Sequence, residues 1–359
     1  MSESALQFPW RLQKPAPGKT LSLRPGIHWV RMPLPFALDH INLWMLEDGD
    51  ATHEAGWAIV DAGVATPAVQ EAWRQVWRTA ASEAQASARL TRVIVTHMHP
   101  DHVGSAQWLI DTFSAPPSSA RLWMSAGDHF AALLSCKETT GYGGQAATAF
   151  FRSHGLTDAD SLRKIEQRSG YYASMVPQVP MPYRRLMHGM TVQIGQRHWR
   201  CITGYGHAPE HISLFDEADH TLISGDMILP KISTNVSVTS VEPEGDALGL
   251  YLDSIHALKD LPADTLVLPS HGLPFVGLHA RIAQLEDHHR ARLDDILQAM
   301  TKGPQTAASL LGVLFKRELD LHQTTFAMGE SVAHLNHLWH RGEVIRHADD
   351  EGIWQFSRR

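Results

Sequence analysis

The chain has few cysteines and no long apolar stretch. Only two of its 359 residues are cysteines, Cys136 and Cys201, which excludes a disulfide framework and suits a reducing compartment. No run of about 18 apolar residues occurs, so we expect no transmembrane helix. The first residues, MSESALQFPW, contain no apolar signal segment. We therefore expect a cytoplasmic protein with no membrane partner.

The chain also lacks an excess of basic residues. Its 31 lysines and arginines face 38 aspartates and glutamates, which gives a net charge of −7. A general nucleic-acid-binding protein usually carries a basic domain, so this net charge disfavours that class. It does not exclude a local basic patch on the surface. With 43% hydrophobic and 19% charged residues, the composition is that of a folded globular protein. Histidine is abundant, with 23 residues, several of them in tight clusters.

The distribution of prolines, glycines and apolar segments predicts three parts. Residues 1–25 contain four prolines and are expected to form an irregular N-terminal arm. Residues 26–280 alternate short strand-like and helical segments and are expected to form the catalytic domain. Within them, residues 115–190 hold eight Lys/Arg and five Asp/Glu between proline- and glycine-rich breaks. This pattern predicts a helical insertion, either a plain surface excursion or a cap over a site. Residues 281–359 are expected to form a linking helix and a small separate domain.

The most informative segment directly follows an expected buried strand. Within six residues it offers four metal-binding side chains: His97, His99, Asp101 and His102. His97 and His99 are two positions apart, so they project to the same side of an extended backbone. Neutral imidazole and carboxylate are ligands that suit zinc, manganese or iron. A histidine-rich polar turn is the alternative, and four ligand-type side chains in this order disfavour it.

Three further candidate ligands follow other expected strands. His207, Asp226 and His271 come at the ends of the segments HWRCITG, TLISG and TLVLPS. Any one of them alone would be an ordinary cap or loop residue. Together with the first cluster they supply enough ligands for two metal sites.

These motifs carry a resemblance to a known family. The H-x-H-x-D-H cluster, Gly-His207-x-Pro, Ser-Gly-Asp226 and Ser-His271-Gly resemble the metallo-β-lactamase superfamily over about residues 25–280. The C-terminal unit resembles that of the lactamase-beta-2-like subgroup, and glyoxalase II is a more distant relative. The resemblance implies an αββα four-layer sandwich with a small winged-helix-like C-terminal domain. It also implies two divalent metal ions, with zinc favoured and manganese or iron as alternatives.

The resemblance further implies a role for each candidate residue. The first ion would be held by His97, His99 and His207. The second ion would be held by Asp101, His102 and His271. Asp226 would bridge the two ions, and Asp61, in the VDAG turn, would support the ligand loops and fix imidazole orientation.

Two features depart from the family pattern. Glu210 stands where many relatives have glycine. The segment after Asp226, MILPKISTNVSV, matches no catalytic signature. Lys231 and Asn235 in this segment are candidate substrate contacts, with plain loop residues as the alternative.

The implied reaction is hydrolysis, with a metal-bridging hydroxide as the nucleophile. The expected catalytic residues are Asp226 and Asp101. Asp226 would bridge the two ions, and Asp101 would orient the water or take a proton. The chain has no Gly-x-Ser-x-Gly elbow and no cysteine in the clusters, so a serine or cysteine hydrolase is not supported. A diiron flavoprotein would need a flavodoxin-like domain, and a metal-independent binding protein would lack some ligands; neither fits this sequence.

The ligands do not select the bond that is cleaved. We expect a small acyl compound, a thioester or an ester such as a lactone. The alternative is an endoribonuclease or phosphodiesterase that acts on single-stranded RNA. The positive insertion would suit either an anionic thioester or RNA.

The C-terminal unit is expected to be accessory rather than DNA-binding. Its pattern predicts a helix opened by Pro304, a second helix, and a hairpin at VIRH–DDEG–IWQF, which is winged-helix order. Residues 301–359 contain seven Lys/Arg and seven Asp/Glu, and the second helix contains no lysine or arginine over 328–340. Since DNA binding draws on phosphate neutralisation, we expect a packed domain that closes one wall of the active site.

Overall fold

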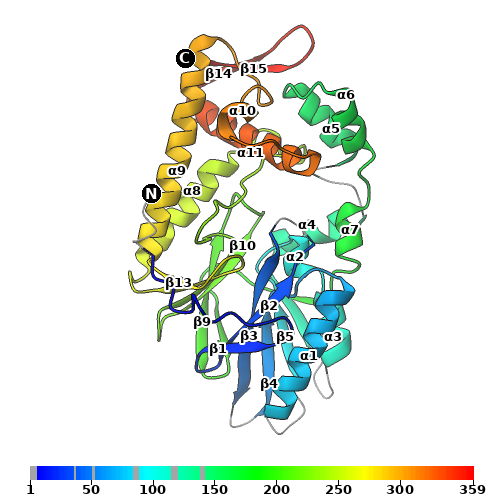
Figure 1. Cartoon of the computed structure of the whole chain (residues 1–359), viewed down its shortest axis with the longest axis vertical. Coiled ribbons are helices and arrows are strands. Elements are labelled where there is room, and N and C mark those ends of the chain that lie inside the picture. Colours follow the sequence, from blue (N-terminus) through cyan, green and yellow to red (C-terminus); the bar gives the residue numbers. More distant parts are fainter. Residues whose placement is uncertain are drawn as a thin grey trace.

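Two β-sheets and a smaller helical unit make up the molecule (Figure 1). The computed structural model describes residues 6–35, 38–50, 53–83, 89–114, 120–137, 141 and 143–359. In Figure 1 the sheets lie in the lower part, and the long helix α9 leads along one side to the C-terminal unit at the top. Among the described residues, no helix is both long enough and apolar enough to cross a membrane.

The first sheet combines antiparallel and parallel strands. Strands β1 to β4 pair antiparallel, and β4 to β7 pair parallel, so the strands lie in the order of the sequence. The described strands are β1 (Thr20–Arg24), β2 (Ile27–Pro33), β3 (His40–Asp50), β4 (His53–Val60), β5 (Leu90–Ile94), β6 (Arg121–Met124) and β7 (Tyr183–Arg185).

The second sheet has the order β13-β12-β11-β10-β9-β8, and only its β11–β12 pair is parallel among the described strands. Its strands are β8 (Thr191–Ile194), β9 (Arg197–Gly204), β10 (His211–Asp216), β11 (Thr221–Gly225), β12 (Leu266–Pro269) and β13 (Phe275–Val276). Strand β10 is buried along its whole length, including its polar residues His211, Ser213 and Asp216.

Strand β3 shows why the sheets form separate layers. Successive side chains of a strand point to opposite faces. Trp44 and Leu46 accordingly pack between the two sheets, whereas Leu43 and Met45 pack on the outer face of the first sheet. Both faces of this strand are therefore buried, one against the other sheet and one against helices.

Helices cover the outer faces of both sheets. The outer face of the first sheet is covered by α1 (Pro67–Glu83), α2 (Pro100–Val103), α3 (Ala106–Phe113) and α4 (Ala126–Lys137). The outer face of the second sheet is covered by α8 (Ala247–Ala257), η2 (Leu258–Asp260) and α9 (Leu278–Ala299). The expected αββα sandwich is confirmed.

The C-terminal unit follows α9 and consists of helices and a two-stranded sheet. Its elements are η3 (Met300–Lys302), α10 (Leu311–Leu314), α11 (Leu321–His340), β14 (Val344–Ala348) and β15 (Trp354–Arg358). The expected hairpin is confirmed by the antiparallel pairing of β14 and β15. The prediction of a helix that begins at Pro304 is wrong. Gln305 instead forms an isolated antiparallel bridge with Phe356 of β15, and α10 begins only at Leu311.

Two expected boundaries differ from the structure. The N-terminal arm is not irregular throughout, because β1 within it pairs with β2. The expected helical insertion at 115–190 contains β6 and β7, which belong to the first sheet. Its described helices lie between these strands: α4, α5 (Gly144–Ser153), α6 (Ala159–Glu166) and α7 (Tyr171–Met175).

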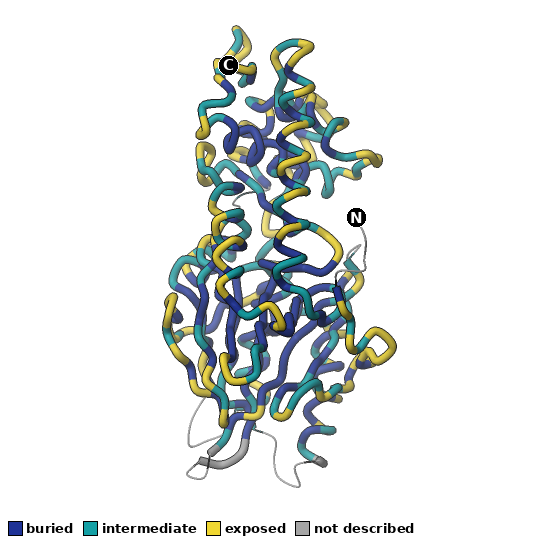
Figure 2. The backbone as a smooth tube through the Cα atoms, turned by 90° about the vertical axis from the view of Figure 1, so that its left-hand side faces the viewer, coloured by how far each residue is buried: buried dark blue, intermediate teal, exposed yellow. Residues whose placement is uncertain are grey.

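Helices α5 and α6 share one hydrophobic core with the C-terminal unit. Phe151 of α5 and Leu162 of α6 pack in the same buried cluster as Val332 and Leu335 of α11. Figure 2 shows buried residues both between the sheets and among these upper helices. The insertion thus contributes to a packed upper layer as well as to the sheet.

Two buried histidines, His289 of α9 and His334 of α11, predict a loss of stability in acid. His334 donates from Nδ1 to the Glu330 carbonyl, and its Nε2 lies 3.2 Å from Nδ1 of His289. Burial lowers the pKa of His289 to about 2 and that of His334 to about 4. Because the unfolded chain binds these protons near pH 6.5 and the folded chain does not, the free energy of unfolding should fall as the pH drops below about 6.5, by about 1.4 kcal/mol per pH unit for each histidine.

Urea unfolding between pH 6.5 and 4.5 measures this slope. His289→Gln should make the dependence shallower by about 1.4 kcal/mol per pH unit. The exposed His347, replaced by glutamine, provides the control and should leave the slope unchanged. Equal slopes for the wild type and His289→Gln would contradict the prediction.

Candidate metal centre

The loop after β5 carries four of the expected ligands. His97 and His102 are buried, whereas His99 and Asp101 are partly exposed. Pro100 begins the short helix α2, where its missing N–H group is not needed, and this places Asp101 and His102 on the first helical turn. The sharp change from strand to helix lets all four side chains turn toward one region.

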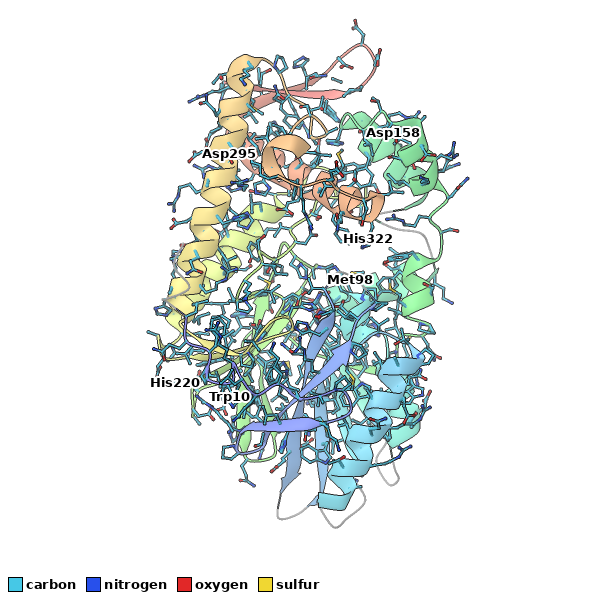
Figure 3. The ribbon with its side chains drawn as sticks, viewed as in Figure 1. Trp10, Met98, Asp158, His220, Asp295 and His322 are labelled. Atoms are coloured by element: carbon cyan, nitrogen blue, oxygen red, sulfur yellow. The ribbon has the colours of Figure 1, made fainter. Side chains whose placement is uncertain are left out.

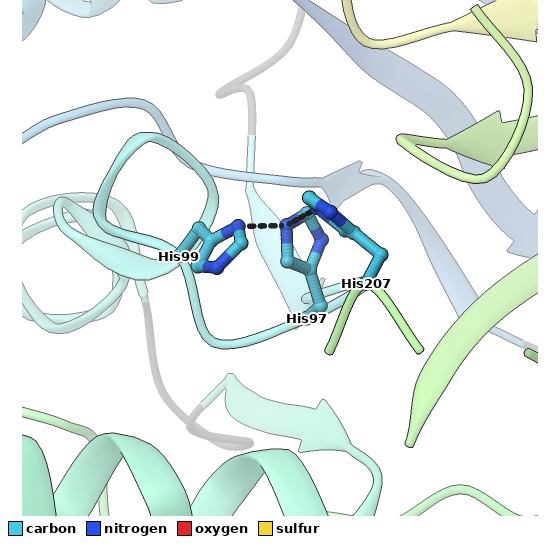
Figure 4. A group of neighbouring side chains, drawn as sticks. All are labelled: His97, His99 and His207. Atoms are coloured by element: carbon cyan, nitrogen blue, oxygen red, sulfur yellow. Dashed lines mark hydrogen bonds between the residues drawn. The ribbon is translucent and has the colours of Figure 1, made fainter. Parts of the chain in front are cut away.

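Three imidazole nitrogens converge in the first group (Figure 4). Nε2 of His97 lies 2.9 Å from Nδ1 of His99 and 3.2 Å from Nε2 of His207. Ligand nitrogens on a four-coordinate zinc ion, at about 2.0–2.1 Å from the metal, lie roughly 3.3 Å apart. The group therefore has nearly the spacing that a single divalent ion requires.

A second group lies beside the first. Nε2 of His271 is 3.4 Å from Oδ2 of Asp101, and Nε2 of His102 is 3.7 Å from the same oxygen. The ligand atoms of these three residues all lie within 4.8 Å of one another. A mixed set of imidazole and carboxylate ligands suits a divalent transition metal.

Asp226 lies between the two groups. Its Oδ2 is 3.5 Å from Nε2 of His207 and 3.7 Å from Nε2 of His102, and its Oδ1 is 3.5 Å from Nε2 of His271. Among the described residues, Oδ1 of Asp226 and Nε2 of His102 are buried without a hydrogen-bond partner. Because buried polar atoms are nearly always paired, these two atoms fit a bound cation.

Four of the candidate histidine ligands have their Nδ1 atom in contact with another group of the protein. Nδ1 of His207 contacts the Asn235 carbonyl at 2.6 Å, and Nδ1 of His271 contacts the His40 carbonyl at 2.9 Å. The remaining contacts are Nδ1 of His97 with Oγ1 of Thr96 at 3.1 Å and Nδ1 of His102 with Oδ2 of Asp61 at 2.8 Å. Such contacts leave the other ring nitrogen of each histidine available to a metal ion.

Asp61 contacts both the ligand loop and one of the candidate ligands. It is buried, and its Oδ1 accepts a hydrogen bond of 2.8 Å from the backbone N–H of Thr96, next to His97. Asp61 has a φ of +61°, a left-handed conformation that aspartate tolerates better than most residues. The turn thus aims one carboxylate at both the loop backbone and His102.

The electrostatics of the centre favour a cation. Burial lowers the pKa of His97 well below its usual range and that of His99 to about 3, so both are neutral and able to bind metal. Burial opposes the ionisation of Asp101, but His102 and His271 outweigh it and lower its pKa to about 2. Burial likewise opposes protonation of His271, but Asp226 and Asp101 raise its pKa to about 10. The carboxylates thus create a negative potential that positive charge must balance.

Two further residues connect the ligand loops and carry no local signal in the sequence. Asp128 of α4 accepts hydrogen bonds from the backbone N–H of Met98, at 2.8 Å, and of Glu210, at 2.6 Å. The hydroxyl of Tyr172 in α7 donates to the Met98 carbonyl at 2.5 Å. Both tie the first ligand loop to distant segments, so only folding brings them to the centre.

His211 is a third residue whose place the sequence did not indicate. It is buried, its ring stacks on that of His97 with centroids 4.9 Å apart, and its Nε2 accepts from the backbone N–H of Asp226 at 3.2 Å. Its neighbour Glu210, the departure from the family pattern, accepts from the backbone N–H of Gly127 at 2.8 Å, in the first turn of α4. That carboxylate therefore satisfies a helix N-terminus.

The two candidate substrate contacts have different surroundings. Lys231 is exposed. Asn235 is partly buried, its side chain accepts from Oγ of Ser237 at 2.8 Å, and its backbone carbonyl contacts Nδ1 of His207 at 2.6 Å. These contacts favour a positioning role for Asn235, whereas a substrate contact by Lys231 stays a prediction.

Comparisons with known proteins match most of the chain. The model of the metallo-beta-lactamase superfamily matches residues 38–271, and that of the metallo-beta-lactamase-like C-terminal domain matches residues 293–359. A probable metallo-hydrolase of Bacillus subtilis (strain 168), YqjP, is 26% identical over 323 residues, which cover 86% of this chain and 90% of that protein.

Two solved structures are similar over nearly the whole chain. A beta-lactamase domain protein from Burkholderia ambifaria is 46% identical, with a TM-score of 0.91 and 99% of both chains covered. The metallo-beta-lactamase family protein TTHA1429 from Thermus thermophilus is 26% identical, with a TM-score of 0.74, and 94% of this chain and 100% of that chain are covered. From its fold, its clustered ligands and these matches, the chain belongs to the metallo-beta-lactamase superfamily and is a metallo-hydrolase.

Proposed function

We propose that this metallo-hydrolase holds two divalent ions, zinc by preference, and cleaves the ester-type bond of a small acyl compound. One observation carries the proposal: seven ligand-type side chains form two adjacent groups, and Asp226 lies within 3.7 Å of histidines from both. Divalent ions bound in such a centre would activate water for attack and polarise the bond to be cleaved.

The side chains would take distinct roles in this reaction. His97, His99 and His207 would hold one ion, and Asp101, His102 and His271 the other. Asp226 would hold both at a fixed separation. Asp101 is the more exposed of the two central carboxylates, with 18% of its side chain accessible against 10% for Asp226. Since its pKa of about 2 keeps it ionised, Asp101 is suited to accept a hydrogen bond from the attacking water and orient it.

A panel of substrates tests the bond class. Metal-loaded protein is assayed with an acyl-coenzyme A, a lactone, a bis-aryl phosphodiester and single-stranded RNA, and its metal content is measured by mass spectrometry. We expect turnover of an acyl substrate and two equivalents of metal per chain. Cleavage of RNA or the phosphodiester alone would replace the proposal by the nuclease alternative. One equivalent of metal at full activity would overturn the dinuclear centre.

A further inference from the structure

The first turn of α4 contacts both loops that carry the first group of ligands. One loop follows β5 and holds His97 and His99, and the other follows β9 and holds His207. Strands β5 and β9 belong to different sheets, so contacts that join their loops help to set how far the third histidine lies from the first two. Figure 3 shows Met98, between His97 and His99, at the upper end of the first sheet.

Asp128 in this turn accepts a hydrogen bond from each loop. Its Oδ1 accepts from the backbone N–H of Met98 at 2.8 Å, and its Oδ2 accepts from the backbone N–H of Glu210 at 2.6 Å. Met98 lies between the first two histidines, and Glu210 lies three residues after the third. One carboxylate thus joins the two loops, with one oxygen on each.

Glu210, the residue at which the sequence departs from the family pattern, binds back to the same turn. Its Oε2 accepts from the backbone N–H of Gly127 at 2.8 Å. A Cβ atom at Gly127 would lie 3.0 Å from Cβ of Glu210, so the absence of a side chain there permits this close approach. The loop and the first turn of α4 therefore hold each other through reciprocal hydrogen bonds, one from each backbone to the other carboxylate.

The surroundings of Asp128 make these contacts important. The residue is fully buried, and an ionised carboxylate in such a place is unfavourable unless it is hydrogen-bonded. Burial raises its pKa to about 6, and the hydrogen bonds from the backbone of Met98 and of Glu210 oppose that rise. Oγ of Ser125 also donates to Oδ2, at 3.3 Å, which is the longest of the three contacts. The two loop N–H groups are therefore the main partners of this carboxylate.

We propose that Asp128 is a positioning residue that fixes the distance of His207 from the other two histidines of the first group, and so sets the affinity of that group for its divalent ion. Glu210 strengthens the hold through its contact with α4. The inference rests on the proposed metal centre, and it gives the first described helix of the insertion a role in the site. Contacts that orient metal-bound histidines typically change metal affinity by 10–100-fold. Because Asp128 holds the backbone of the loops rather than the imidazoles, we expect the lower end of that range.

Cobalt titration of the metal-free full-length protein tests the inference without an activity assay. Visible absorption of bound Co²⁺ reports both affinity and ligand geometry. At about pH 8, where Asp128 is ionised, Asp128→Ala removes both acceptor oxygens. It should weaken the binding of one Co²⁺ equivalent about tenfold and alter its spectrum. His99→Ala should affect the same equivalent, which assigns it to the first group; an effect of Asp128→Ala on the other equivalent alone would contradict the inference.

Two variants of Glu210 test the second half of the contact. Glu210→Ala removes the acceptor for Gly127 but keeps the backbone N–H that donates to Asp128, so it should weaken the same equivalent about threefold. Glu210→Gln retains an acceptor oxygen and should bind Co²⁺ as the wild type does. The side chain of Glu210 is 22% exposed, so its replacement is milder, and Glu210→Ala decides the test if Asp128→Ala does not fold.

Asp48→Ala is the matched control. Asp48 is also a buried aspartate that accepts from the backbone of a distant segment, the N–H of Gly195 at 3.1 Å. It pairs with Gly56 near the start of β4, whereas Asp61, at the metal centre, follows the end of that strand. This variant should lower the melting temperature but leave Co²⁺ affinity and spectrum unchanged. If it weakens Co²⁺ binding as much as Asp128→Ala does, the effect is general destabilisation and the inference is wrong.

The results separate this inference from the proposal on which it rests. Wild-type affinity and spectrum in a folded Asp128→Ala protein, or in Glu210→Ala where Asp128→Ala does not fold, would overturn the inference alone. Failure of the wild type to bind Co²⁺ would overturn the proposed metal centre, and with it this inference.

Discussion

Replacing Asp226 with asparagine should lower the rate of hydrolysis about 10³-fold and reduce the bound metal from two equivalents to one. Its two carboxylate oxygens face ligands of both groups, at 3.5 Å from His207 and 3.5 Å from His271. Asparagine keeps the shape but has one oxygen and no charge, so it cannot serve two cations. A loss of about 4 kcal/mol in transition-state stabilisation corresponds to this factor.

The measurement combines initial rates with metal content for the substrate that the panel identifies. Asp216→Asn is a matched control, because Asp216 is also buried but pairs with Arg197, away from the centre. It should leave metal content at the wild-type value. An Asp226→Asn protein that keeps two equivalents and full activity would show that Asp226 is not the bridging group.

Replacing Asp61 with alanine should destabilise the protein by about 3–5 kcal/mol. Asp61 is 1% exposed, and it accepts hydrogen bonds from the backbone of Thr96 and from His102 at 2.8 Å each. Its removal leaves a buried N–H group and a buried imidazole without their acceptor, which is among the most destabilising kinds of substitution. Metal binding should weaken as well, since the ring of His102 then keeps only its contact with Oγ1 of Thr96, at 3.2 Å.

Urea unfolding of the metal-free protein measures the stability, and Co²⁺ titration measures the affinity. Asp61→Asn is the informative companion variant. It tolerates the left-handed backbone at this position and retains one acceptor oxygen, so it should lose less stability than Asp61→Ala. A loss below about 1 kcal/mol for Asp61→Ala would contradict the role assigned to the carboxylate.

The C-terminal unit and the insertion are parts of one packed layer. The sequence left the insertion open as a surface excursion or a cap, because its proline and glycine breaks say nothing about what its helices touch. In the structure, α5 and α6 pack against α11 in one core, while Tyr172 of α7 holds the ligand loop. Besides its excess of basic residues, the segment therefore contributes to the packed core and supports the ligand loop.

The candidate ligands could be predicted from the residues alone, and the fold class from the family resemblance that their motifs carry. Short buried strands leave nearly continuous apolar runs, and a cluster such as His97 to His102 is local, so both are readable along the chain. His207, Asp226 and His271 were candidates because each follows an expected strand, and the resemblance then assigned each of them to a metal ion. Local patterns failed where a boundary depends on pairing, as for the strand β1 within the expected arm.

The orientation and support of these ligands come from contacts that no local pattern reveals. Asp128 accepts hydrogen bonds from Met98 and from Glu210, which lies 82 residues further along the chain than Asp128 itself. The carbonyl of Gly329 in α11, from a different unit of the chain, accepts from the backbone N–H of Val238 in the loop that follows Asp226. A single carboxylate in a helix has no periodicity or motif that could reveal such a contact. The orientation of a metal ligand depends on hydrogen bonds between segments distant in sequence, and folding alone brings those segments together.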